Sequence, residues 1–245
     1  MVDLAANSDD GIVVVHSSDI HVDDGYTARA HGGDGTRGLR CVLATAAALG
    51  ADVVLLAGDV FEHNRLPQAL LDRTVELLTQ AAVPIVILPG NHDPLTPDSA
   101  YERGAIHGPD NVHVIGLTQE HSIKLPHFDL EVWGHAHRDY GNMAPLAAAR
   151  PRTTRWQIVM AHGHYEAAAE IGAVHRPSWL IHDHQITATE ADYVALGHWN
   201  RAVRVGNGHV PAYYSGSPDL ANTVNLIRLK ADGTVAVARE EMIWD

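Results

Sequence analysis

Short apolar runs alternate with longer amphipathic segments over the first hundred residues. The runs at Ile12–Val15, Val53–Ala57 and Ile85–Leu88 are rich in β-branched residues, which is typical of buried strands. Between these runs, residues 38–49 and 67–82 carry apolar side chains at helical spacing. Strands that alternate with helices predict parallel βαβ units.

The pattern changes after residue 93. Two more apolar runs, Ile158–Ala161 and Tyr193–Leu196, again indicate buried strands, whereas the other segments are short and alternate between apolar and polar residues. We expect antiparallel strands in these alternating segments, which are Val112–Ile115, Ser122–Leu125, Asp129–Trp133, Arg201–Val205, Val210–Tyr214, Val224–Leu229 and Thr234–Ala238. Residues 140–155 and 165–185 predict loops and short helices. Because no repeat or linker interrupts the chain, we expect residues 1–245 to form a single α/β domain with two mixed sheets.

Composition narrows the class of protein. The 245 residues are 46% hydrophobic and 19% charged, which excludes a disordered or fibrous chain. No apolar run is long enough for a transmembrane helix, and the first residues lack the basic and apolar parts of a signal peptide. The single cysteine, Cys41, excludes an internal disulfide and a cysteine-based zinc site. These features predict a cytoplasmic protein with no membrane association.

Charge and histidine content point to metal chemistry. The net charge of −13 opposes sequence-independent binding of nucleic acid across the surface. The 18 histidines outnumber the 17 lysines and arginines, and histidine is the commonest metal ligand in proteins.

Five of the predicted strands are followed by side chains that can bind metals. The carboxyl ends of such strands meet at one edge of a sheet, where ligands bind in α/β folds. Each residue alone is weak support, but the ordered set predicts a metal centre formed by Asp19, His21, Asp59, Asn91, His162 and His198.

This ordered set resembles the calcineurin-like metallophosphoesterase superfamily, whose pattern is D-x-H, G-D, G-N-H-D/E, H and G-H-x-H. The matching segments are Asp19–His21, Gly58–Asp59, Gly90–Asp93, His162 and Gly197–Asn200. The resemblance spans residues 12–216. It implies a four-layer α/β/β/α sandwich with a two-metal centre between the sheets.

The resemblance also implies roles for the site residues. One divalent cation would be bound by Asp19, His21, Asp59 and the residue at the last motif position, which is Asn200. The other would be bound by Asp59, Asn91, His162 and His198, so that Asp59 bridges the two. A hydroxide that bridges both cations would attack the phosphorus atom.

Two further residues are candidates for catalysis. His92 corresponds to the histidine that approaches the scissile ester. Asp93 or a backbone carbonyl would orient its ring, although Asp93 before Pro94 is also good turn chemistry.

Asn200 departs from the family pattern, which has histidine there. An amide oxygen is a poorer ligand for soft ions, so we expect a weaker first site or a preference for harder ions. Mn²⁺ is the favoured ion, and Fe, Zn, Ni and Mg are alternatives. Water could also occupy the position of this ligand.

A second segment, residues 134–137, matches the G-H-x-H motif more closely than residues 197–200 do. We prefer His198 because no histidine between residues 93 and 133 ends a buried apolar strand. His135 and His137 are then expected at the rim of the site.

Two stretches resemble the SbcD-like DNA-repair exonuclease branch of the superfamily, namely residues 58–65 and 213–218. The resemblance favours a phosphodiester substrate and makes nuclease activity a hypothesis. However, the chain has no basic run, and the residues after 218 leave room only for closing strands, so we expect no DNA-capping domain. The alternatives are a phosphatase of small phosphomonoesters and a metal-poor protein-binding scaffold.

Overall fold

The computed structural model describes residues 11–23, 25–141, 143–146, 149–167 and 179–244. In chain order its elements are β1 (Ile12–Ser17), α1 (Tyr26–Ala30), α2 (Arg37–Ala48), β2 (Val53–Ala57), α3 (Gln68–Gln80), β3 (Ile85–Leu88), α4 (Ala100–Arg103), β4 (Val112–Val114), β5 (Ser122–Leu125), η1 (Pro126–Phe128), β6 (Leu130–Gly134), β7 (Trp156–His162), β8 (His164–Glu166), β9 (Leu180–His182), α5 (Asp183–Ala188), β10 (Tyr193–Gly197), β11 (Val203–Val205), β12 (Ala212–Tyr214), α6 (Pro218–Ala221), β13 (Thr223–Leu229) and β14 (Val235–Glu241).

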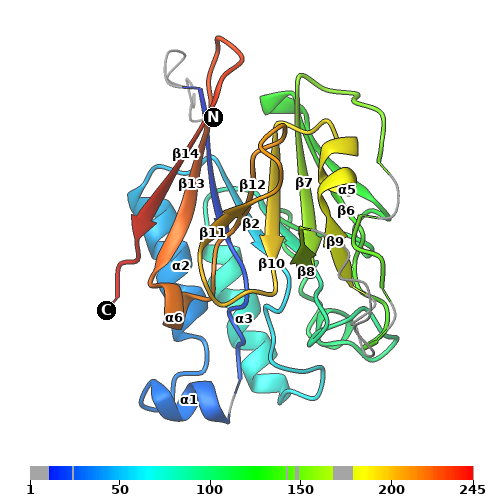
Figure 1. The fold of residues 1–245 in the computed structure, drawn as a ribbon. Helices are drawn as coiled ribbons and strands as arrows, with labels where there is room; N and C mark the ends of the chain where they lie inside the picture. Colours follow the sequence, from blue (N-terminus) through cyan, green and yellow to red (C-terminus); the bar gives the residue numbers. More distant parts are fainter. Residues whose placement is uncertain (1–10, 24, 142, 147–148, 168–178, 245) are drawn as a thin grey trace.

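The strands form two six-stranded mixed sheets (Figure 1). The first has the order β14-β13-β1-β2-β3-β4, in which β1 to β4 are parallel and β13 and β14 are antiparallel to their neighbours. The second has the order β11-β12-β10-β7-β6-β5, in which β12, β10, β7 and β6 are parallel and the two edge strands antiparallel. A small parallel pair, β8 and β9, lies outside both sheets.

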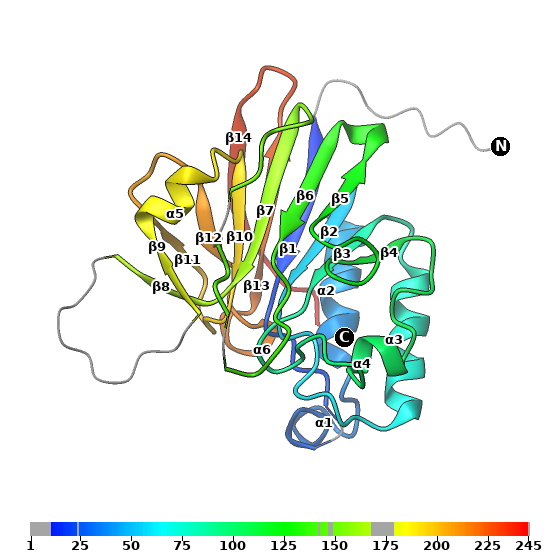
Figure 2. The ribbon, with the colours of Figure 1, turned by 90° about the vertical axis from the view of Figure 1, so that its right-hand side faces the viewer.

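The two sheets pack face to face, and helices cover their outer faces (Figure 2). Ile158, Met160 and Tyr193 of the second sheet belong to the same buried cluster as the strands of the first sheet. The alternate residues Val159 and Val194 join a second cluster on the outer face, which also includes residue 186 of α5. Successive side chains of a strand point to opposite faces, so these strands separate two apolar layers.

The layers follow the order α/β/β/α, as the family resemblance implies. Helices α2 and α3 cover the first sheet, whereas over the second sheet the described part of the chain places only the short α5 (Figure 2). The predicted strands and both predicted helices are confirmed with small shifts at their ends.

The antiparallel expectation is wrong for β4, whose one neighbour, β3, runs parallel to it. It holds in part for β6 and β12, each of which has one parallel and one antiparallel neighbour. The chain between β3 and β4 passes through α4 before it re-enters the sheet, and such a crossover returns the strand in the same direction. The expectation is confirmed where short turns join neighbours, as in β5–β6 and β13–β14.

No helix in the described residues combines the length and the apolar character needed to cross a bilayer. The topology brings the carboxyl ends of β1, β2 and β3 next to those of β7 and β10, at the lower end of the molecule in Figure 1.

Candidate metal centre

The loops after five strands meet at this edge and are joined by hydrogen bonds. The Asp19 backbone N–H donates to the Gly58 carbonyl at 3.0 Å, which joins the loops after β1 and β2. The His198 N–H lies 2.9 and 3.1 Å from the two carboxylate oxygens of Asp19, which connects the first sheet to the second. The loops that carry the predicted site residues are thus held together before any ligand binds.

The backbone is strained at these loops. Asp19, His21 and Asp59 have φ of 53°, 53° and 51°, and His198 has φ of 105°. These four make up half of the eight non-glycine residues with positive φ in the described chain. Residues other than glycine adopt this region rarely, and such strain gathers at functional sites because the surrounding contacts impose it.

Two groups of donor atoms share one carboxylate. Ligand atoms of Asp19, His21 and Asp59 all lie within 4.8 Å of one another, and so do those of Asp59, His162 and His198. Two three-donor groups with a common carboxylate match the requirement for two neighbouring cations. The structure therefore brings together five of the seven predicted metal ligands around Asp59.

The surroundings of His162 favour a cation. Its Nδ1–H donates to the Ala57 carbonyl at 2.9 Å, so Nε2 is the nitrogen that faces the site. This Nε2 lies 3.1 Å from a carboxylate oxygen of Asp59 and 3.1 Å from the Asn91 side-chain oxygen. Three electron-pair donors converge in a buried place, where a proton or a metal ion must balance them. The donor set fits a divalent cation.

The pKa shifts of the site residues also indicate that this place requires positive charge. Burial raises the pKa of Asp19. Burial acts in the same direction on Asp59, but the charge of His162, its hydrogen bond to Asp59 and the charges of His92 and His21 together lower the pKa of that carboxyl. For His162, burial favours the neutral form, yet attraction by Asp59 raises its pKa to about 9. In the absence of a metal, the His162 proton supplies the charge that a cation would supply.

The remaining predicted ligand, Asn200, lies at the edge of this centre. Its side chain is exposed and lines a cavity together with Asp19 and His21. Asn200 thus shares this cavity with two residues of the first donor group, and its role as a metal ligand stays a prediction.

His92 lies beside the centre with its ring half-exposed. Its backbone N–H donates to the Asp59 carboxylate at 2.9 Å, and its ring Nδ1–H donates to the Glu62 backbone carbonyl at 3.0 Å. The ring packs edge-on against His21 at 4.9 Å between centroids. A backbone carbonyl therefore orients His92, which was one of the two options from the sequence.

Glu62 is a site residue that sequence reasoning missed. Its carboxylate lies 2.7 Å from His21 Nδ1 and 3.5 Å from His92 Nδ1. The contact with His21 lowers the pKa of Glu62 and leaves His21 Nε2 as the nitrogen available to a cation. Its position three residues after Asp59, in a segment already linked to the site, was the available signal.

Asp93 points away from the metal centre into the fold. Its buried carboxylate accepts hydrogen bonds from the Gly90 N–H at 2.6 Å, the Phe61 N–H at 3.0 Å and the Tyr101 hydroxyl at 2.6 Å. Burial and the nearby Asp59 charge raise its pKa to about 6. The contacts favour a role in holding the loops after β2 and β3. A catalytic role for Asp93 stays a prediction.

The segment 213–218 supports Asp19 indirectly. The Ser18 hydroxyl donates to the Asp19 carboxylate at 2.5 Å and lies 2.8 Å from the Ser215 hydroxyl. Both serines are buried. Ser215 therefore helps to fix the orientation of Asp19 through Ser18.

The histidines of the competing segment lie elsewhere than expected. His137 is completely buried, so it is not a rim residue, and its Nε2–H donates to the His162 backbone carbonyl at 2.8 Å. Strands β6 and β7 are neighbours in the sheet, so the segment after β6 lies next to the end of β7. His137 therefore packs against His162, with ring centroids 5.7 Å apart. His135 packs against His121 and Trp133 and lines a separate hollow.

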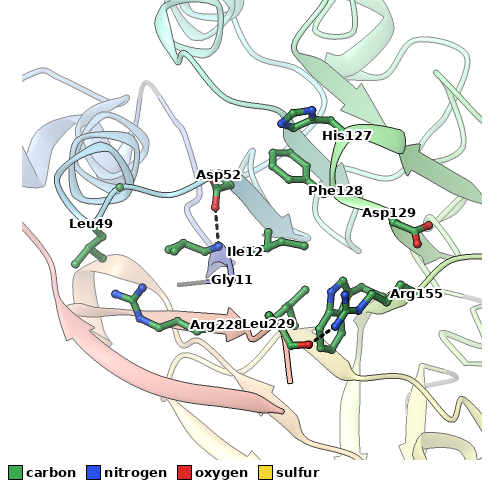
Figure 3. Close-up of a pocket in the computed structure, with 14 residues that line it drawn as sticks. Gly11, Ile12, Leu49, Asp52, His127, Phe128, Asp129, Arg155, Arg228 and Leu229 are labelled. Carbon is green, nitrogen blue, oxygen red and sulfur yellow. Dashed lines mark hydrogen bonds between the residues drawn. The ribbon is translucent and has the colours of Figure 1, made fainter. Parts of the chain in front are cut away.

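Two large cavities lie at opposite ends of the sheets. One, of about 670 Å³, adjoins the metal centre and includes Asp19, His21 and Asn200 in its lining. The other, of about 660 Å³, contains none of the predicted site residues (Figure 3). In it Asp52 accepts a hydrogen bond from the Val13 N–H, at the amino ends of the parallel strands. Only the first cavity is placed to receive a substrate of the metal centre.

Comparisons with known proteins identify the family of this chain. The sequence model of the calcineurin-like phosphoesterase family matches residues 12–237. Among curated proteins, no sequence matches the chain. The fold is similar to that of the Thermus thermophilus protein TT1561, with a TM-score of 0.58 and 13% identity over 93% of this chain and 98% of that one.

It is also similar to a Staphylococcus aureus protein assigned provisionally as a 5'-nucleotidase, solved in complex with α-ketoglutarate. That likeness has a TM-score of 0.60 and 14% identity, and it covers 96% of this chain and 54% of that one. At such identities the likenesses show the fold alone, whereas the family match spans most of the chain. The chain therefore belongs to the calcineurin-like phosphoesterase family of metal-dependent phosphoester hydrolases.

Proposed function

We propose that this protein is a phosphodiesterase that uses two bound divalent cations. We propose Mn²⁺ as the favoured cation. The observation that carries the proposal is the pair of largely buried donor groups that share Asp59, with His92 beside them. When bound, the two cations supply positive charge to the phosphoryl oxygens and acidify the attacking water.

His92 is the residue that we propose to act on the substrate. Its Nδ1–H is engaged by the Glu62 carbonyl, so Nε2 is the atom free to face a bound ester. From Nε2 it would donate a hydrogen bond to a phosphoryl oxygen or a proton to the leaving oxygen. The Glu62 carboxylate lies 3.5 Å from the same Nδ1 and adds a second contact that orients the ring.

The charge around the site favours a diester over a monoester. The adjoining cavity contains the half-exposed Glu62 and the exposed Asp219, and among its lining residues Arg37 is the one lysine or arginine. A phosphodiester carries one negative charge, whereas a monoester carries nearly two at neutral pH. Acidic side chains next to the metal centre oppose the more highly charged substrate.

Asn200 supports the choice of ion. An amide oxygen at the last motif position is a harder donor than imidazole and suits Mn²⁺ or Mg²⁺ better than softer ions. We therefore propose Mn²⁺ at the first donor group.

The test compares bis-p-nitrophenyl phosphate with p-nitrophenyl phosphate, each in Mn²⁺ and in EDTA. We expect Mn²⁺-dependent cleavage of the diester with a higher kcat/KM than that of the monoester. His92→Ala should lower kcat on the order of 100-fold or more without loss of bound metal. His127→Ala is the matched control, because this exposed histidine lines the cavity at the opposite end of the sheets.

Each other result identifies a different function. Preference for the monoester would replace the proposal with a phosphatase of small molecules. Diester cleavage that extends to DNA would favour the nuclease hypothesis. Absence of turnover with every divalent ion would overturn the proposal and favour a protein-binding scaffold.

A further inference from the structure

The cavity beside the metal centre extends to a wall of aromatic side chains. It begins at Asp19 and His21 and reaches Tyr26, His31 and Trp244, which come from the segment around α1 and the residues after β14. Its volume of about 670 Å³ lies in the range of sites that bind small molecules. A substrate whose phosphate is at the metals would therefore place its organic group near these rings.

Hydrogen bonds hold this wall in place without a ligand. The His31 ring stacks on Trp244, with centroids 6.0 Å apart and planes inclined by 25°. Its Nε2–H donates to Asp219 at 3.0 Å, and its Nδ1 accepts from Arg37 at 3.2 Å, as the neutral Nε2–H tautomer allows. The indole N–H of Trp244 donates to the Asn222 side-chain oxygen. Such preorganisation reduces the entropy lost when a ligand binds.

The cavity also exposes apolar side chains. Tyr26 is 78% exposed and Leu220 is 71% exposed, the two highest values among the large hydrophobic residues of the described chain. Both line this cavity. Apolar surface that remains exposed beside a catalytic site is typical of ligand-binding grooves.

The charge of the wall excludes a second anionic group as its natural ligand. The Arg37 guanidinium lies 5.2 Å from the Trp244 ring centre and contacts His31, so its charge is directed at the wall itself. Asp219 and Glu62 add negative charge to the same cavity. A neutral, flat ring system fits these surroundings better than a phosphate or a carboxylate.

We propose that the organic group of the substrate is a planar aromatic ring system of nucleobase size, bound against Tyr26 and Trp244. This inference rests on the proposed function, because the phosphate must be at the metal centre for its organic group to reach the wall. It assigns phosphodiesters of nucleosides in preference to phosphodiesters of sugars or aliphatic alcohols.

The test uses AMP and ribose 5-phosphate as competitors of bis-p-nitrophenyl phosphate hydrolysis. The two share phosphate and sugar and differ only in the base. We expect the inhibition constant of AMP to be lower by about 10-fold or more, since stacking on aromatic side chains is available only to the base. If a competitor is itself hydrolysed, its competition constant equals its KM, and the two compounds are then compared on KM.

Variants locate the effect. Tyr26→Ala and Trp244→Ala should each reduce the ratio of the two constants to less than about 3-fold, a loss expected when one stacking partner is removed. The Tyr26 side chain is exposed, so its removal leaves the core intact. Phe128→Ala is the control, because this aromatic residue lines the cavity at the other end of the sheets and should keep the wild-type ratio.

Equal inhibition by AMP and ribose 5-phosphate in the wild-type protein would overturn the inference. The proposed function would still hold in that case if bis-p-nitrophenyl phosphate is hydrolysed. A ratio unchanged in both wall variants would also overturn it. If no hydrolysis occurs, the proposed function fails, and calorimetric titration of the Mn²⁺-loaded protein with the same two compounds then measures the ratio directly. Equal affinities in that titration would overturn the inference as well.

Discussion

Two glycines at the strand ends allow the metal centre to close. A Cβ atom at Gly58 would lie 2.0 Å from His162 Nδ1, and one at Gly90 would lie 2.2 Å from a carboxylate oxygen of Asp59. No side chain fits at such distances. The glycines of the motifs are therefore required because the predicted ligands pass directly over the backbone of the neighbouring loops.

Gly58→Ala should abolish the metal centre. We expect loss of bound Mn²⁺ and a decrease in kcat/KM on the order of 100-fold or more, since the new methyl group displaces His162. The measurement is metal content of the purified protein together with diester hydrolysis.

Gly233→Ala is a matched control, because Gly233 has φ of 90°, close to the 91° of Gly58, but nothing within 4 Å of its Cβ position. It should cost about 1 kcal/mol in free energy of unfolding from backbone strain alone and keep full activity. Full metal content in Gly58→Ala would contradict this account.

At the scale of elements, strand β1 carries a buried histidine between the two sheets. His16 is fully buried, and its Nδ1 lies 3.0 Å from the hydroxyl of Tyr193 on β10. Burial lowers its pKa to about 3. The packing of β1 against β10 therefore requires the neutral ring.

This burial makes stability depend on pH. Below pH 6.5 the unfolded chain binds a proton at His16 that the folded chain does not bind until about pH 3, so stability is lost as pH falls through this window. We expect the unfolding free energy of the wild-type protein to fall by about 1.4 kcal/mol more per pH unit than that of His16→Gln between pH 6 and 4.

Urea denaturation at several pH values measures the two slopes. The control is His127→Gln, which changes an exposed histidine and should retain the wild-type slope. Parallel slopes for the wild-type protein and His16→Gln would show that His16 is protonated in the folded state.

At the scale of the whole molecule, the metal centre joins the two sheets. Asp19 and Asp59 follow strands of the first sheet, whereas His162 and His198 come from the second. The carboxylates are buried, and in the absence of cations the charge of His162 opposes their repulsion. Cations bound at this junction should therefore stabilise the fold.

Removal of metal should lower the melting temperature. At Mn²⁺ about 100-fold above its Kd, binding contributes about 2.7 kcal/mol, which corresponds to roughly 5–10 °C for a chain of this size. We expect a decrease of that order when EDTA replaces Mn²⁺, measured by thermal unfolding.

Asp59→Asn should remove the difference between Mn²⁺ and EDTA, because both donor groups share this carboxylate. Asp129→Asn is the control, since Asp129 has φ of 46°, similar to the 51° of Asp59, and lies at the opposite cavity. Equal melting temperatures of the wild-type protein in Mn²⁺ and EDTA would contradict a structural contribution of the metals.

The features of this molecule that depend on residues close together in the sequence could be predicted from the sequence. Buried strands and the two long helices follow from local apolar periodicity. The predicted ligands were recognisable because each comes directly after a buried strand, and the carboxyl ends of parallel strands share one edge. Asp19, Asp59 and His162 are close together in the structure for this reason.

Other features depend on contacts between segments far apart in the sequence. Glu62 contacts His21 and His92 because the loops after three strands converge, and its place three residues after Asp59 does not specify these contacts. Asp93 is adjacent to His92 in sequence, yet its carboxylate turns to Tyr101 and two backbone N–H groups. The contacts of a side chain follow from its three-dimensional neighbours, which the order of residues does not specify.

The sequence by itself determined the strands, the order of the metal-binding residues and the family. The tertiary structure alone decided the direction of β4, the burial of His137 behind His162 and the aromatic wall that joins Tyr26 to Trp244. The physical reason is the range of the interactions: backbone periodicity acts over a few residues, whereas packing joins residues from opposite ends of the chain.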